Sequence, residues 1–406
     1  MKIRKAYKFR LKPSGKQEEM LRQYMGAVRF AWNKVLALNL ERLHNRQPLI
    51  WYNESDYWSK LWKASEEYGF LAAVPAHCLQ QKLRDLDKAF RDAFNSNQPL
   101  KRIPRFKKRG LHDSIRFPEA KHIQIENRRI KLPKMGWMGF FKSQAIKGSI
   151  KNATISIQGQ HLYVSIQVEQ EINTTLAKNP VSAIGVDMGI ASFAALSTGE
   201  MLQPINSFRM LENKLAKAQK KLSRKKRFSS NWKKQKTKIQ ILHRKIANTR
   251  YDFLHKSSTT LCKNHAMIVV EDLKIKNMSK SAKGSIETPG TNVSAKSGLN
   301  KSILDQGWGE FRRQLEYKLT WSGGVFVKVA PHYTSQCCSQ CGYTDKKNRN
   351  RQSQFECQEC SYRNNADINA ANNILAAGHA VLACGEEPLG ASAKQEPLRK
   401  SDPLAA

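Results

Sequence analysis

Acidic residues are scarce in this chain of 406 residues, which has 33 Asp and Glu against 70 Lys and Arg. The formal net charge is therefore +37. A protein with this excess repels itself unless a polyanion neutralises the charge, and nucleic acid is the usual polyanion. The composition thus favours a nucleic-acid partner over a merely soluble basic surface.

Long apolar segments are lacking as well. No run of 18 or more apolar residues occurs, and the basic start MKIRKAYKFR is not followed by the apolar core of a signal peptide. Neither a membrane span nor secretion is expected. Four of the eight cysteines form two Cys-x-x-Cys pairs, which suits a reducing compartment with a metal site better than a disulfide framework. We therefore expect an intracellular protein.

Three acidic residues stand at the ends of predicted elements in the second half of the chain. Asp187 follows the apolar strand AIGV, Glu271 follows the strand MIVV, and Asp367 opens the Ala/Asn-rich helix ADINAANNILAAG. A lone acid at a strand end is usually a solvated loop residue. Three converging carboxylates, however, can hold two Mg²⁺ ions roughly 3.5–4 Å apart that clamp the attacking and leaving oxygens of a phosphodiester. The sequence therefore predicts a phosphodiester-cleaving site.

The two cysteine pairs, Cys338 with Cys341 and Cys357 with Cys360, are separated by 15 residues. Four thiolates at this spacing can surround one zinc ion, and they leave no coordination position open for catalysis. We predict a structural zinc site. Cys337 is a fifth thiol, which we interpret as a spectator, although it could replace Cys338.

Candidate nucleic-acid-binding residues lie in three segments. The first joins a helix that begins after Ser14 to a helix over 77–94, with an aromatic cluster between them that favours packing over base stacking. The second, 101–109, is an extended basic loop, and the third, 209–256, holds 17 Lys or Arg against two acids on two helices broken near residue 228. Solvated faces are the alternative in each segment. The candidates are Tyr52, Gln80, Arg84, Arg105, Lys107, Lys108, Arg109, Arg224, Lys225, Lys226 and Arg227.

Apolar periodicity outlines the remaining elements. Alternation from 114 to 170 predicts an antiparallel β unit that could close into a barrel with an opening strand at 5–11. A mobile loop is expected at 279–300, followed by a helix at 303–321.

Seven segments of the chain resemble the TnpB family, the RNA-guided nucleases of IS200/IS605-type transposons and relatives of the Cas12 effectors. In family order they are KAYKFRLKPSGKQEEMLRQYMGAVRFAWN, IPRFKKR, AIGVDMG, IVVEDLKIKNM, GWGEFRRQLEYK, TSQCCSQCGYTD and NADINAANNIL. The resemblance implies an α/β multidomain fold that combines a β-barrel with an RNase H-like (RuvC) nuclease domain. The expected parts are a wedge-like N-terminal β-barrel at 1–178 with a helical recognition insertion at about 14–112, the nuclease domain at 179–335 and 363–381, an inserted zinc ribbon at 336–362 and a disordered tail at 382–406.

The resemblance also implies a function. The chain would be a Mg²⁺-dependent endonuclease that cuts double-stranded DNA, with Asp187, Glu271 and Asp367 as catalytic metal ligands. A guide RNA from the transposon end would pair with the target, and the N-terminal helices would read a short motif beside it. We expect a monomer in the cytoplasm of a prokaryote, associated with the nucleoid.

Two other functions remain as alternatives at this point. A nuclease-inactive RNA-guided DNA-binding regulator, or an accessory transposition protein, would explain the charge and the cysteines but would not need three intact acids. A transposase that joins DNA ends by itself is disfavoured, because the chain has no His-hydrophobe-His motif with a nucleophilic Tyr.

Overall fold

A computed structural model describes residues 1–110, 113–172 and 182–383 of the chain. The chain divides into two compact units, Met1–Ile172 and Asn173–Ala406. The predicted boundary between residues 178 and 179 lies outside the described residues, as do the end of the predicted insertion at residue 112 and most of the predicted tail. The domain limits therefore stay a prediction, except that helix reaches Ala383, inside the stretch expected to be tail.

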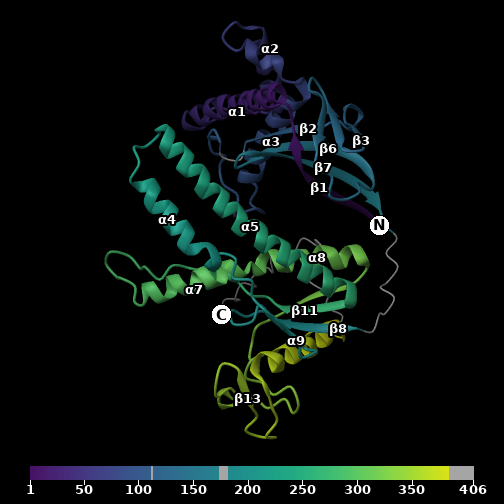
Figure 1. Cartoon of the computed structure of the whole chain (residues 1–406), viewed down its shortest axis with the longest axis vertical. Coiled ribbons are helices and arrows are strands. Elements are labelled where there is room, and N and C mark those ends of the chain that lie inside the picture. Colours follow the sequence, from purple (N-terminus) through teal and green to yellow (C-terminus); the bar gives the residue numbers. More distant parts are fainter. Residues whose placement is uncertain (111–112, 173–181, 384–406) are drawn as a thin grey trace, which may run out of the picture. The chain divides into compact units, whose positions relative to one another are not determined.

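Three helices form the α-helical part of the first unit (Figure 1): α1 (Gly15–His44), α2 (Tyr52–Ala64) and α3 (Ala76–Phe94). The predicted start of α1 is confirmed, since the Ser14 hydroxyl accepts from the Gln17 amide and the Gln17 side chain accepts from the Ser14 amide. A short 3₁₀ helix, Gly69–Ala73, links α2 to α3. The apolar stripes of α1 and α3 are buried in one core.

Seven antiparallel strands make the sheet of the first unit, in the order β2-β6-β7-β1-β5-β4-β3. Alternating buried and half-buried residues along β7 show why the sequence alternation predicted strands here. Among the described strands the ladder runs from β2 to β3 as an open sheet, so closure into a barrel stays a prediction. The strands are β1 (Lys2–Lys12), β2 (Ser114–Phe117), β3 (Gln124–Glu126), β4 (Arg129–Leu132), β5 (Gly136–Phe140), β6 (Ser149–Gln158) and β7 (His161–Glu171).

The second unit is built on a five-stranded sheet in the order β10-β9-β8-β11-β12. The three strands β8, β11 and β12 run parallel, whereas β9 returns antiparallel to β8. The central strands β8 and β11 are short and apolar up to their last residue, as expected for strands whose two faces are both covered. The strands are β8 (Ala183–Asp187), β9 (Ala194–Leu196), β10 (Met201–Leu202), β11 (Met267–Glu271) and β12 (Val325–Val329).

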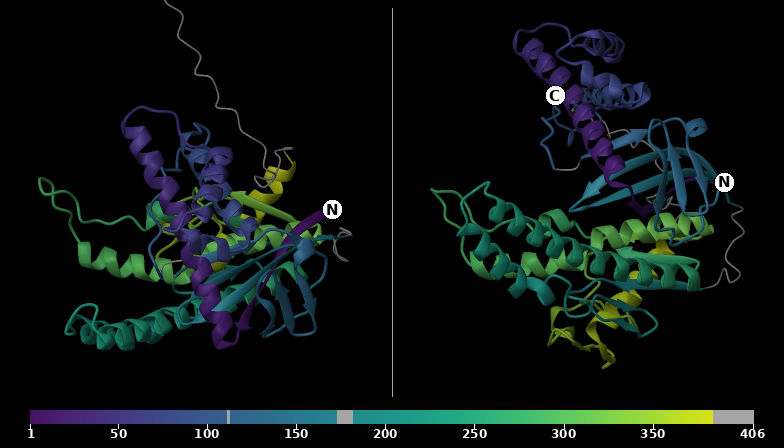
Figure 2. Two further views of the ribbon diagram at one scale, coloured as in Figure 1. Left: turned by 90° about the horizontal axis from the view of Figure 1, so that it is seen from above. Right: turned by 45° about the horizontal axis from the view of Figure 1, so that its top comes forward.

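Helices cover both faces of this sheet. One face packs against α5 (Ser230–Asn264) and α8 (Trp308–Ser322), and the other packs against α9 (Ala366–Ala383). The helix α4 (Glu212–Ser223) lies beside the N-terminal part of α5 in all views of Figures 1 and 2, and the predicted break near residue 228 is confirmed. None of the helices in the described ranges is long and apolar enough to cross a membrane.

The region between β11 and β12 corrects two predictions. The expected loop at 279–300 follows the single turn α6 (Ile275–Met278) but becomes helical in its second part, where α7 (Val293–Gln306) begins. The expected helix at 303–321 is split between α7 and α8 by Gly307, whose φ of 75° is left-handed. Tertiary contacts stabilise the polar start of α7, since Lys296 donates to the Met278 carbonyl oxygen at 2.7 Å.

Candidate active site and metal centre

Two of the predicted acids lie on neighbouring parallel strands. Val186 of β8 is the partner of Val270 of β11, so Asp187 and Glu271, the next residue of each strand, emerge together at the carboxyl edge of the sheet. Glu271 is 8% exposed, and its Oε1 accepts from the Thr334 hydroxyl at 2.6 Å. Arg312 of α8 donates to Asp272 at 3.0 Å and so fixes the end of β11.

The third acid arrives from the far end of the chain because α9 lies directly on the sheet. A Cβ on Gly185 of β8 would clash with the Ala371 carbonyl oxygen, and a Cβ on Gly378 of α9 would clash with Val269 of β11. Both glycines therefore permit a close helix-to-sheet approach. This approach brings Asp367, in the first turn of α9, to the strand ends that carry the other two acids.

The electrostatics of Asp187 show that the three carboxylates are near one another. Burial, together with the charges of Glu271 and Asp367, raises the pKa of Asp187 to about 7, although Arg349 acts in the opposite direction. The Arg349 guanidinium donates to Asp367 at 3.0 Å and so neutralises part of the cluster. A cluster of acids that repel one another in this way is suited to holding cations.

The four predicted cysteine ligands form a cluster between β12 and α9, around the hairpin of β13 (Gln354–Glu356) and β14 (Arg363–Asn365). The Sγ atoms of Cys338 and Cys360 are 3.7 Å apart, and those of Cys341 and Cys357 are 3.6 Å apart. Four sulfurs at about 2.3 Å from a zinc ion would be separated by roughly 3.8 Å, so the cluster fits tetrahedral zinc. The Cys337 thiol contacts the Gly342 carbonyl oxygen instead.

Asparagine side chains of α9 connect the cysteine segment to the helix that carries Asp367. Asn373 donates to the carbonyl oxygens of Thr334 and Cys337 at 2.8 and 2.7 Å. Asn369 donates to the same Cys337 oxygen at 2.8 Å and accepts from the Ser339 amide at 3.0 Å. The cysteine segment and the acidic site are therefore joined through one helix.

Comparison with known proteins identifies the family of the chain. The chain is 50% identical over 398 residues to "Putative RNA-guided DNA endonuclease InsQ" of Escherichia coli K12, covering 98% of each chain. The chain belongs to the TnpB family of IS605-type transposon proteins. A relative from Streptomyces pristinaespiralis, with a similar name, is 31% identical over 411 residues and covers 98% of this chain and 97% of its own.

Family models match three parts of this TnpB-family chain. The model described as a probable transposase of the IS605 OrfB type matches residues 163–282, and the TNB domain model of Cas12f1-like proteins matches residues 308–374, which include all four cysteines. A helix-turn-helix model matches residues 1–48, where the structure has β1 and the single long helix α1.

The fold has a solved counterpart. The structure of the RNA-guided endonuclease CRISPR-Cas_phi3 is 12% identical and covers 92% of both chains with a TM-score of 0.50. The TnpB-family chain thus has a Cas12-like mixed α/β fold.

The predicted nucleic-acid-binding residues differ in their accessibility. Arg84 is exposed and lies over the half-buried Tyr52 ring, 4.6 Å from its centroid, whereas Gln80 donates to Asp56. Gln80 is therefore less free than the sequence suggested. Among the basic candidates, Lys225 is half-buried. The exposed ones are Arg105, Lys107, Lys108, Arg109, Arg224, Lys226 and Arg227.

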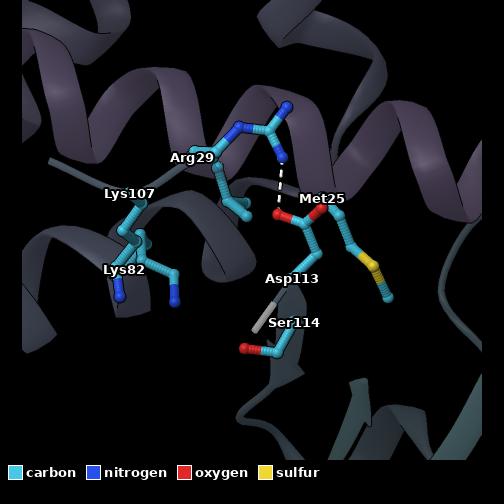
Figure 3. Close-up of a pocket in the computed structure, with 7 residues that line it drawn as sticks. Met25, Arg29, Lys82, Lys107, Asp113 and Ser114 are labelled. Atoms are coloured by element: carbon cyan, nitrogen blue, oxygen red, sulfur yellow. Dashed lines mark hydrogen bonds and ion pairs between the residues drawn. The ribbon is translucent and has the colours of Figure 1, made fainter. Parts of the chain in front are cut away.

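The basic segment 101–109 is anchored to α1. The Trp32 indole donates to the Arg105 carbonyl oxygen at 3.2 Å, and Asn33 exchanges hydrogen bonds with the Lys107 backbone. Figure 3 shows the adjoining pocket, in which Asp113 points to Arg29. Burial lowers the pKa of Lys82 there, and Lys107 lowers it further while Asp85 opposes the shift. The pocket is therefore rich in positive charge that one ion pair does not neutralise.

Sequence reasoning missed the residues that support the acids. Thr334 and Arg349 hold Glu271 and Asp367, but an isolated Thr or Arg in a polar segment carries no distinguishing pattern. The asparagines did leave a signal. Asn369 and Asn373 are spaced four apart, which places them on one face of α9.

Proposed function

We propose that the chain is an RNA-guided, Mg²⁺-dependent endonuclease that cuts double-stranded DNA. The observation that carries the proposal is the convergence of Asp187, Glu271 and Asp367 at one edge of a sheet, although Asp187 and Asp367 are 180 positions apart in the chain. The names of the E. coli and Streptomyces relatives support the same activity. A site of three carboxylates with metal ions can cleave many phosphodiesters. The proposal that RNA guides the cleavage therefore rests on family membership.

The sheet supports an RNase H-like (RuvC) nuclease fold. It has an antiparallel pair on one side and three parallel strands on the other, and the three acids stand at the carboxyl ends of β8 and β11 and at the start of α9. When bound, two Mg²⁺ ions would activate water and stabilise the leaving 3′ oxygen. Asp187, Glu271 and Asp367 would hold them, Thr334 would orient Glu271, and Arg349 would lie beside Asp367, where it could meet a phosphate.

The cysteine cluster would hold a structural zinc. All four sulfurs lie within 4.8 Å of one another, and they leave no open position for substrate. Zinc would fix the segment from which Thr334 and Arg349 reach the acids.

The basic surfaces would hold nucleic acid. The exposed cations of 101–109 and 224–227 would bind phosphates of a guide RNA, transcribed from the transposon end, and of its DNA target. In the first unit, Arg84 and Tyr52 would contribute to reading a short motif beside the target. Base pairing with the guide would select the sequence.

The test is cleavage of a plasmid by the chain purified with its flanking transposon RNA. Asp187→Asn should lower the cleavage rate by about 10³-fold or more while RNA and target binding persist, because two-metal catalysis needs every ligand. Asp252→Asn, which removes an exposed acid paired with Lys256 in α5, is the matched control and should cut normally. An Asp187→Asn variant that cuts at the normal rate would refute the proposal. A wild-type complex that binds its target without cutting would favour the regulator.

A further inference from the structure

The connection between α4 and α5 exposes an aromatic side chain at the end of a helical hairpin. Phe228 is 65% exposed, although it is a large apolar residue. Its ring centroid lies 5.6 Å from that of Trp232, in the first turn of α5, and the two rings are tilted by 57°. We call these two residues the aromatic tip.

Neither the backbone conformation nor packing favours a phenylalanine at position 228. Phe228 has a φ of 67°, in the left-handed region where a bulky side chain is unfavourable and glycine is preferred. The ring also buries little of its surface in return. A residue that strains the backbone and remains exposed is a candidate for contact with a ligand.

The surroundings of the aromatic tip select the chemistry of that ligand. The Arg227 guanidinium lies 5.0 Å from the Phe228 centroid, and the Lys236 amino group lies 5.1 Å from that of Trp232. Between residues 224 and 238 there is no acidic residue, and the eight basic residues are Arg224, Lys225, Lys226, Arg227, Lys233, Lys234, Lys236 and Lys238. Aromatic faces among cations match a polyanion that also has flat apolar groups, which describes single-stranded nucleic acid.

We propose that the aromatic tip stacks on unpaired bases of the RNA that the chain binds. This inference rests on the proposed function, because it assumes a bound guide RNA. Bases in a DNA duplex are stacked inside it, whereas loops and ends of folded RNA offer free base faces. Folded RNA also offers these faces before any DNA strand is opened, so RNA can cover the exposed ring in the DNA-free complex.

Binding of the full chain to its co-purified RNA in EDTA, measured over a range of salt concentrations, tests the proposal. Phe228→Gly should weaken the RNA Kd by about tenfold, which is the effect of losing one stacked base. The slope of log Kd against log salt should not change, because no charge is lost. The melting temperature should not fall, since glycine accepts the left-handed backbone.

Two control variants separate stacking from charge. Lys234→Ala, which removes one exposed cation near the tip, should lower the salt slope. Met210→Ala removes a 70% exposed apolar side chain from the same unit and should leave Kd unchanged. Ultraviolet cross-linking of the wild-type complex should attach RNA to Phe228 or Trp232.

Each remaining outcome overturns a definite claim. If wild type binds RNA and Phe228→Gly binds it equally well, the aromatic tip has no stacking role. If the loss appears only with a single-stranded DNA of the same sequence, the partner is DNA and the assignment to RNA is wrong. If wild type binds no specific RNA, the proposed function fails, and this inference fails with it.

Discussion

The second unit contains two clusters of potential metal ligands that are built in opposite ways. The cysteines come from one short segment, 338–360, and their sulfurs already lie at the separations that one metal ion needs. The carboxylates come from three distant segments. Burial and repulsion from the other two acids raise the pKa of Asp187 to about 7, and Arg349 pairs with Asp367. We propose that the first cluster is a closed site that stabilises local structure and that the second is an open site that the fold must hold together.

This difference is the one expected between a structural metal ion and a catalytic one. A site with four protein ligands has no place for water or substrate, so its metal can only support the fold. Carboxylates that repel one another are unfavourable without a metal and are stabilised when cations bind. The bound cations can then also coordinate a phosphodiester substrate. The experiments below test whether the two clusters differ in this way.

The largest effect is expected from the cysteine cluster. Cys357→Ser combined with Cys360→Ser should remove one zinc per chain and unfold the segment 337–362, because structural zinc contributes roughly 10 kcal/mol or more to folding. Metal analysis and hydrogen exchange would measure both. Cys337→Ser is the matched control, and it should retain zinc because its thiol lies outside the four-sulfur cluster. Zinc-free wild-type protein with an ordered segment would contradict the closed-site description.

The acidic site should show the opposite behaviour in the absence of metal. Asp187 has a pKa of about 7 in the folded chain and about 3.9 in an unfolded one. Between these values the folded state binds more protons, so stability falls as the pH rises from about 4 to 7. Asp187→Asn should therefore raise the melting temperature in EDTA by about 5 °C at pH 8 and by much less at pH 4.5.

Magnesium provides the check on this result. Mg²⁺ should stabilise wild type at pH 8 and reduce its difference from Asp187→Asn, because the cation offsets the repulsion. An equal difference at both pH values would mean that Asp187 carries no burial or repulsion penalty.

Contact between the two clusters gives an intermediate effect. Asn373→Leu removes two hydrogen bonds from α9 to the backbone at Thr334 and Cys337. We expect about a tenfold lower cleavage rate with normal zinc content, since each lost bond costs about 1 kcal/mol and loosens the alignment of the acids. Asn372→Leu, one position along the helix, is the control. Equal rates for the two variants would show that the clusters act independently.

The sequence predicted each cluster from local pattern and could not predict how they are held. Cysteine spacing within one segment is a short-range signal, and Cys338, Cys341, Cys357 and Cys360 do cluster as expected. Two strand ends and a helix start also marked the acids, although their catalytic role stays a prediction. The contacts of Thr334 and Arg349 depend on where β11 and α9 lie in space. The split at Gly307 was missed for a different reason, since a glycine within a helical sequence pattern gives no indication of its φ angle.

The smallest expected effect concerns a single hydrogen bond to the acidic site. Thr334→Val keeps the shape of the side chain but removes the hydroxyl that donates to Glu271 Oε1 at 2.6 Å. A cost of about 1 kcal/mol predicts a fivefold slower cleavage at limiting Mg²⁺. Excess Mg²⁺ should restore the rate, because the carboxylate would remain in place with less favourable orientation. Thr344→Val, in the cysteine segment, is the control and should cut normally. If Thr334→Val cuts slowly at every Mg²⁺ concentration, Thr334 does more than orient a metal ligand. The segment that precedes the cysteines would then contribute directly to cleavage at the acidic site.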